Sequence, residues 1–307
     1  MYPAPHSLLA PPADRPGLRP GVSRRRVIHA FGTLGVTGFA AAGYGAGIEA
    51  ESLLVTRYRL TPPRWPAGMR LSISVIADLH AGGPNMLVSH IGRIVATANL
   101  LNSDIVLLMG DYFATHRFVT ERVPHPVWAA ELARLKARLG VWSIFGNHDW
   151  WYDIDGVRAA LAGVGIPVLE NQAVLIGKPQ RPFWLAGLGD QLAHPLGHHR
   201  FKGEDDLPRA LAQVDTDHPV ILMVHEPDVF TEVPERVSLT LAGHTHGGQI
   251  RLPFVWPHYV PSAYGARFAY GHIVEQGRHM IVSGGLGCSN VPIRLGVPPE
   301  IVRIDLG

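Results

Sequence analysis

Residues of the types that bind metal ions stand just after several apolar segments of this sequence. In chain order they are Asp78, His80, Asp111, Asn147, His225, His244 and His246. Carboxylate, imidazole and amide ligands without a thiolate suit zinc, manganese or iron, and the sequence does not rank these metals. We therefore expect a metal site built from these side chains.

The segments before these residues have the composition of buried strands. The central one, residues 106–109, reads Val-Leu-Leu-Met and leads into Gly110 and Asp111. The others are residues 71–77, 141–145, 219–224 and 237–242. Such a run suits a strand that is covered on both faces, with a polar site beyond its carboxyl end. We therefore expect five strands to bring their ligands to one edge of the fold.

Two pairs of ligands share a spacing of two residues. Asp78 and His80 form one pair, and His244 and His246 form the other. Side chains at positions i and i+2 of an extended segment point to the same side. We therefore expect an extended backbone to aim both members of each pair at one site.

Helical patterns alternate with the first strands. Apolar residues recur at helical spacing within 85–101, and two more helices are predicted at 126–139 and about 154–162. This alternation implies a parallel sheet with right-handed crossovers. Further strands are expected at 52–59, 173–176, 183–187, 267–275, 279–283 and 301–304, with a short helix near 207–213. A two-sheet α/β sandwich fits this order best.

Composition limits the classes of protein that the chain can represent. Its 307 residues, 47% hydrophobic and 17% charged, can bury a large core in a single catalytic domain. A net charge of +2 gives no reason to expect a nucleic-acid partner, because the only compact basic run is at residues 24–26. Cys288 is the single cysteine, so the chain has no internal disulfide.

The N-terminal 48 residues resemble an export segment rather than part of the domain. Residues 1–22 are rich in proline and predict a disordered leader. Residues 23–48 join Arg24, Arg25 and Arg26 to an uncharged run, residues 30–48, as in a twin-arginine signal or a membrane anchor. The alternative is a basic turn before a glycine-rich helix. We expect residues 49–307 to form the single domain.

The five motifs together resemble the calcineurin-like metallophosphoesterase family. They are Asp78-x-His80, Gly110-Asp111, Gly146-Asn147-His148-Asp149, His225 and Gly243-His244-x-His246. The resemblance covers about residues 71–251 and implies an α/β/β/α sandwich with its site at the carboxyl ends of the strands. Residues 58–66 and 284–300 further resemble the bacterial phosphodiesterase branch that carries twin-arginine signals.

This resemblance implies two divalent or trivalent metal ions, of manganese, zinc or iron. The first would be held by Asp78, His80 and His246, the second by Asn147, His225 and His244, and Asp111 would bridge them. Hydroxide would then be the nucleophile, and His148 would protonate the leaving oxygen. The alternative for His148 is a packed histidine. Many relatives orient it with an aspartate where this chain has Ala114, so we expect Asp149 or Asp153 to take that role, or no partner at all.

Residues that could contact a substrate are less well defined. Trp150, Trp151 and Tyr152 could wall a cleft or simply pack in the core. Arg294, beyond the glycine-rich loop at 283–290, could bind a phosphate, although a tight turn also explains the loop. Residues 194–200 contain three histidines and predict a solvated surface loop rather than a metal site.

The predicted function is hydrolysis of a phosphodiester or phosphoanhydride outside the cytoplasm. Substrates would include lipid-linked or nucleotide-sugar phosphates, because an anchor through residues 30–48 places the cleft near the membrane. The chain would use the twin-arginine export machinery and be either membrane-anchored facing outward or periplasmic after cleavage. The alternative is a catalytically silent metal-binding protein. A β-lactamase-like site is excluded because no His-x-His-x-Asp-His run occurs.

Overall fold

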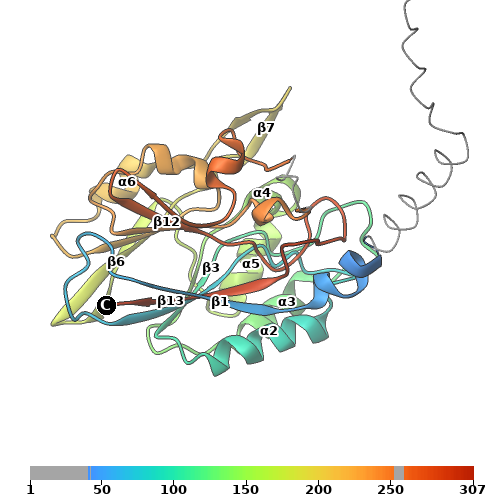
Figure 1. Ribbon diagram of the computed structural model, residues 1–307, viewed down its shortest axis with the longest axis horizontal. Helices are drawn as coiled ribbons and strands as arrows, with labels where there is room; N and C mark the ends of the chain where they lie inside the picture. The colour runs from blue at the N-terminus through green and yellow to red at the C-terminus, as the bar shows by residue number, and fades with distance from the viewer. Residues whose placement is uncertain (1–40, 42, 252–258) are drawn as a thin grey trace, which may run out of the picture. The chain divides into compact units, whose positions relative to one another are not determined.

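The apolar runs of the sequence form two β-sheets that pack face to face (Figure 1). The computed structural model describes residues 41, 43–251 and 259–307. The first sheet, in the order β1-β13-β2-β3-β4, consists of β1 (Leu54–Leu60), β13 (Glu300–Leu306), β2 (Leu71–Ile76), β3 (Ile105–Leu108) and β4 (Val141–Ser143). The second sheet, in the order β11-β12-β10-β9-β6-β5, consists of β11 (Gly271–Glu275), β12 (Arg278–Val282), β10 (Leu239–Ala242), β9 (Val220–Met223), β6 (Arg181–Gly187) and β5 (Gln172–Lys178).

The strands that lead into the predicted ligands run parallel to one another within each sheet. In the first sheet β2, β3 and β4 are parallel neighbours, and in the second sheet β9 pairs in parallel with both β6 and β10. Strand β13 pairs antiparallel with β2, and antiparallel strands β5 and β11 close the edges of the second sheet. Parallel neighbours end at the same side of a sheet, so their carboxyl ends lie together.

Each central strand is buried on both faces, as its composition predicts. In β3, Ile105 and Leu107 face the second sheet, whereas Val106 and Leu108 pack under the helices. In β9, Ile221 faces the first sheet and joins the same inter-sheet core. Alternation along a strand therefore divides one apolar run between two cores.

Helices cover the outer face of each sheet and complete the predicted α/β/β/α sandwich. Helices α2 (Val88–Leu100), α3 (His125–Leu132) and α5 (Ile154–Gly163) pack on the first sheet. Helix α6 (Leu207–Ala212) and the 3-10 helix η2 (Pro227–Thr231) pack on the second. Figure 1 shows α2 and α3 on one side of the two sheets and α6 on the other. Short segments η1 (Glu49–Glu51), α4 (Asn147–Tyr152), η3 (His246–Gly248) and η4 (Gly265–Phe268) lie in connections.

Two predicted elements were too long. The helix expected over 126–139 ends at Leu132, because the side chain of Asn99 on α2 binds the backbone that follows. Asn99 donates to the carbonyl of Arg134 and accepts from the amide of Lys136. The strand expected over 267–275 begins only at Gly271, since the preceding residues form η4 and bury Phe268 against the second sheet.

Residues 194–202 form a hairpin where we expected a surface loop. Strands β7 (His194–Gly197) and β8 (Arg200–Lys202) pair antiparallel, and the hairpin projects from the body of the fold (Figure 1). His198 and His199 at its turn both have positive φ, 52° and 56°. A two-residue turn with two positive φ angles matches the twist of paired strands, and histidine is not the usual sequence signal for it.

Most of the predicted leader and export segment lies outside the described residues. The compact unit begins at Ala41, so residues 41–48 of the predicted export segment belong to it. There the carbonyl of Ala46 accepts from Asn85, and the carbonyl of Gly45 accepts from the amide of Arg294. Within the described part of the chain, no helix has the length and apolar character to cross a membrane.

Candidate metal centre and catalytic cleft

The seven predicted ligands meet where the carboxyl ends of the two sheets adjoin. Contacts between the sheets fix this arrangement: the ring Nδ1 of His225 lies 2.6 Å from the carbonyl oxygen of Met109, and the amide of His244 donates to Asp78 Oδ1 at 2.9 Å. All seven side chains are buried, none more than 7% exposed. The structure therefore gathers every predicted ligand into one site.

Left-handed turns, rather than an extended backbone, aim the paired ligands. Five of the seven predicted ligands have positive φ: Asp78 (52°), His80 (43°), Asp111 (57°), His244 (69°) and His246 (51°). The extended geometry expected for the two pairs is therefore wrong, although their members do converge. Non-glycine residues rarely adopt this conformation, and such strain is concentrated at functional sites.

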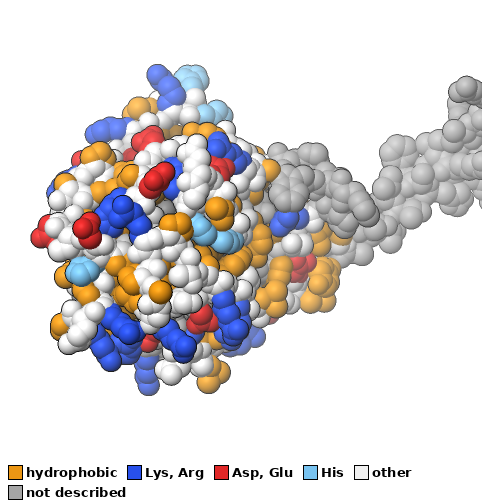
Figure 2. Space-filling view, turned by 60° about the vertical axis from the view of Figure 1, so that its left-hand side comes forward, with side chains coloured by type: hydrophobic (Ala, Val, Ile, Leu, Met, Phe, Trp, Pro, Cys, Tyr) orange, Lys and Arg blue, Asp and Glu red, His pale blue; other side chains and the backbone are white. Residues whose placement is uncertain are grey.

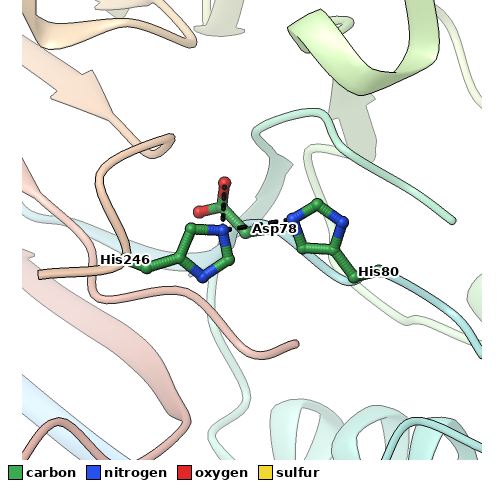
Figure 3. A group of neighbouring side chains, drawn as sticks. All are labelled: Asp78, His80 and His246. Atoms are coloured by element: carbon green, nitrogen blue, oxygen red, sulfur yellow. Dashed lines mark hydrogen bonds and ion pairs between the residues drawn. The ribbon is translucent and has the colours of Figure 1, made fainter. Parts of the chain in front are cut away.

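Asp78, His80 and His246 form the first ligand group (Figure 3). The Nε2 atoms of the two histidines lie 3.1 Å apart, and His246 Nε2 lies 3.7 Å from Asp78 Oδ1. Asp78 Oδ2 accepts no hydrogen bond although it is buried. Unsatisfied buried polar atoms are costly, so converging donors of this kind fit a bound cation.

Asn147, His225 and His244 form the second ligand group. Asn147 Oδ1 lies 3.2 Å from His225 Nε2 and 2.8 Å from His244 Nδ1. Between the two groups, Asp111 Oδ2 lies 3.5 Å from His80 Nε2 and 3.4 Å from His225 Nε2. Two buried groups that share one carboxylate fit a dinuclear metal site.

The pKa values of several predicted ligands favour the protonation state that binds a cation. Burial lowers the pKa of His80 and of His244 to about 3, so both rings are neutral near pH 7. Burial raises the pKa of Asp78 to about 7. Burial also acts to raise the pKa of Asp111, but the positive charges of His225 and His148 outweigh it and hold that pKa well below its usual range. A bridging position requires an ionised carboxylate of this kind.

Sequence reasoning missed Glu226, which lies at the edge of the second group. Its Oε1 atom lies 4.0 Å from His244 Nδ1, and with His225 and His244 it forms a further cluster of buried ligand types. Burial raises the pKa of Glu226, and burial together with the charge of Glu226 raises that of neighbouring Asp190. Its position next to His225 was the only signal in the sequence.

His148 has hydroxyl partners instead of the expected carboxylate. Its Nδ1 is hydrogen-bonded to the hydroxyl of Thr115, the residue after Ala114, and its Nε2 lies 3.3 Å from Ser289 Oγ. Neither predicted partner reaches it. Asp149 accepts from the amides of Asp111, Tyr112 and Gly146, and Asp153 binds His125.

Some of the candidate substrate residues line the cavity at the ligands, and others do not. A cavity of about 180 Å³ opens on the ligands and on His148, and Trp151 and Tyr152 line it. Trp150 instead packs against the helical core and against His194, with ring centroids 5.2 Å apart. Arg294 is fully buried behind the site and donates to the carbonyls of residues 284, 287 and 297, with Nη2 3.0 Å from His246 Nδ1.

The glycine-rich loop approaches the ligand turns closely, which explains its composition. A Cβ atom at Gly285 would lie 2.8 Å from Asp78, and one at Gly287 would lie 2.4 Å from the carbonyl oxygen of Leu79. The loop therefore packs beneath the first ligand group and is held there by Arg294.

Comparison with known proteins identifies the family. Residues 71–248 match the model of the calcineurin-like phosphoesterases. The chain is 29% identical over 291 residues to phosphodiesterase YaeI of Escherichia coli, covering 93% of this chain and 99% of that protein. It is 30% identical over 275 residues to a zebrafish transmembrane protein with a metallophosphoesterase domain, covering 86% of this chain but only 60% of that protein.

The similarity to solved structures is lower. The NAD nucleotidase of Haemophilus influenzae is 16% identical, with a TM-score of 0.46, covering 71% of this chain and 51% of that chain. The family match spans more than half of the sequence and contains all seven predicted ligands. The chain therefore belongs to the calcineurin-like phosphoesterase family.

Proposed function

We propose that this protein is a dinuclear metal-dependent phosphodiesterase. The observation that carries the proposal is the pair of buried ligand groups joined by Asp111, with His148 beside them in the same cavity. Asp78, His80 and His246 would hold one ion, Asn147, His225 and His244 the other, and the ions would be manganese, zinc or iron. Such a pair supplies an activated water and compensates the charge of a phosphoryl group.

The protein side chains would position the ester and move the proton. Hydroxide adds to phosphorus, and the bond from phosphorus to one ester oxygen breaks. His148 gives its proton to that departing oxygen, so the products are an alcohol and a phosphomonoester. The hydroxyls of Thr115 and Ser289 hold the imidazole on opposite sides. Trp151 and Tyr152 line the same cavity.

A diester substrate is favoured over a monoester by one of the relatives. The Escherichia coli protein that aligns along nearly its whole length is described as a phosphodiesterase. Export through the twin-arginine machinery is part of the proposal, on the strength of the N-terminal sequence. A membrane position would then rest on the part of residues 30–48 that precedes the compact unit. Lipid-linked and nucleotide-sugar phosphates then remain as candidate substrates.

The test is a metal-reconstitution assay on the full chain. Protein that has been stripped of metal is refilled with manganese, zinc or iron and supplied with bis(p-nitrophenyl) phosphate or p-nitrophenyl phosphate. We expect metal-dependent cleavage that is faster for the diester, and a loss of about 100-fold or more in kcat for His148→Ala with unchanged metal content. Full metal occupancy without turnover of either ester would favour the silent metal-binding alternative.

A further inference from the structure

A second, larger cavity adjoins the metal centre. It has a volume of about 680 Å³ and shares Trp151, His244 and Tyr259 with the cavity that opens on the ligands. A phosphodiester has two ester arms, and a phosphoryl group at the ligands leaves room in this larger cavity for one of them. The chemistry of its walls therefore bears on the substrate.

One wall of this cavity is aromatic. Trp151 stacks on Phe201 of the β8 strand, with ring centroids 5.7 Å apart and planes 15° apart. The indole Nε1 of Trp151 donates to the carbonyl of Leu192 at 2.7 Å, which fixes the ring. Tyr259, on the opposite segment, is 67% exposed, so its ring is accessible to a ligand.

Another part of the cavity lining is acidic. Glu226 and Asp228 line the cavity, whereas no Lys or Arg occurs among its described lining residues. Both carboxylate oxygens of Asp228 are engaged by Ser262 and Ala263. Glu226 differs: it is only 3% exposed, its Oε2 accepts from the amide of Gln191, and its Oε1 accepts no hydrogen bond. Its neighbours are His244 Nδ1, 4.0 Å from Oε1, and the carboxyl of Asp190, which shares a hydrogen bond with it. A donor that enters from the cavity would satisfy the acceptor capacity that remains.

We propose that this cavity binds the primary ammonium group of an amino-alcohol arm of the phosphodiester. The ammonium donates to Glu226 Oε1, and its charge is attracted by the exposed ring of Tyr259 and by the nearby carboxylates. An anionic arm would meet two carboxylates without a compensating cation, so the same walls reject pyrophosphate and carboxylate esters. The inference rests on the proposed phosphodiesterase function and narrows its substrate class.

The experiment compares matched methyl phosphodiesters on the metal-loaded full chain. The second arm is 2-aminoethyl, 2-hydroxyethyl, propyl or 2-carboxyethyl, and pairs compete in one reaction followed by phosphorus NMR, which detects cleavage of either ester bond. The pH is held at about 8, where histidines with ordinary pKa values are neutral. We expect the 2-aminoethyl ester to exceed the propyl and 2-hydroxyethyl esters by about tenfold in kcat/KM, and the carboxylate ester by more.

Two variants test the named contacts through the same ratio, which does not depend on the fraction of active enzyme. Glu226→Gln should bring the preference for the ammonium ester over the propyl ester close to one. Glu235→Gln, the same change at an exposed glutamate outside the cavity, should leave the ratio unchanged. If Glu226→Gln loses metal, Tyr259→Ala tests the subsite instead, with an expected fall in the ratio of about threefold.

The outcomes separate the two proposals. Turnover of bis(p-nitrophenyl) phosphate without a preference for the ammonium ester overturns the subsite and leaves the phosphodiesterase intact. An equal rate for the 2-hydroxyethyl ester also overturns it, since a neutral donor would then suffice. Failure to cleave any ester at full metal occupancy overturns the proposed function itself.

Discussion

At the scale of single residues, the orientation of His148 depends on a hydroxyl rather than on a carboxylate. Ala114 has no polar side chain to bond the imidazole, and the hydroxyl of Thr115, the next residue, is hydrogen-bonded to Nδ1 instead. A hydroxyl can donate or accept, so it holds the ring without fixing a charge beside it. On the other side of the ring, Ser289 Oγ lies 3.3 Å from Nε2.

Replacement of Thr115 tests this role. Thr115→Val keeps the shape of the side chain but removes the hydrogen bond, and we expect kcat to fall about threefold to tenfold with little change in KM. Thr115→Ser restores the hydroxyl and should recover most of the rate. A valine variant as fast as the parent, or a serine variant as slow as the valine variant, would contradict the positioning role.

The pH dependence of metal binding follows from Asp78. Burial raises its pKa to about 7, so below that pH the metal-free protein holds a proton there that an ion must displace. His80 and His244, with pKa values of about 3, add nothing above pH 5. We expect the affinity for Mn²⁺ to fall about tenfold for each pH unit below about pH 7. This decrease would add to any decrease that protonation of His225 causes. Titration of the stripped chain across about pH 5 to 8 measures this, and a flat affinity below pH 7 would refute it.

At the scale of the elements, close approach of loops sets the geometry of the centre. A Cβ atom at Gly146 would lie 2.4 Å from Asp111 Oδ1 and 2.6 Å from His225 Cε1. Glycine is therefore required between strand β4 and helix α4, where the strand ends and the ligand Asn147 begins a new turn. A glycine precedes three of the predicted ligands, Asp111, Asn147 and His244, and before Asn147 it has a steric cause.

Gly146→Ala should disturb the centre without unfolding the sheets. Displacement of a ligand by about 1 Å can reduce a rate by about 100-fold, so we expect a loss of that order in kcat/KM together with weaker metal binding. Gly163→Ala is the matched control, because a Cβ atom there meets nothing within 4 Å. Retained metal content and activity in Gly146→Ala, measured by elemental analysis and by diester cleavage, would contradict the steric account.

The same elements show what could be predicted from the sequence. The strands at 71–77, 106–109 and 237–242 were predictable because local composition reports burial on both faces. The end of α3 was not, because it depends on Asn99 of another helix. The partner of His148 was missed for the same reason: Thr115 and His148 are 33 residues apart, and only the folded loops bring them together.

At the scale of the whole molecule, the site exists only where two sheets meet. The first sheet carries Asp78, Asp111 and Asn147, and the second carries His225 and the residues of the last motif. The face drawn in Figure 2 intersperses basic and acidic side chains with apolar ones, with Lys and Arg more frequent toward its lower edge. The ligands themselves are buried, so function must be tested at the centre and not at the surface.

The paired arginines near the N-terminus predict that the whole chain is exported. Replacement of Arg24 and Arg25 by lysine keeps the charge but removes the paired arginines that a twin-arginine signal requires. We expect the double variant to remain inside the cell, while the parent chain is cleaved by protease added to spheroplasts. If these residues form only a basic turn on the surface, the parent chain and the double variant should be equally sensitive to the protease.

We propose that two metal ions, bridged by Asp111, make this chain a hydrolase. The most direct measurement follows diester cleavage by the stripped full chain as metal is added, with bound metal counted in the same samples. We predict that activity continues to rise until two ions are bound per chain, and that Asp111→Asn abolishes that rise. Full activity at one ion per chain, or two bound ions without any ester cleavage, would contradict the account.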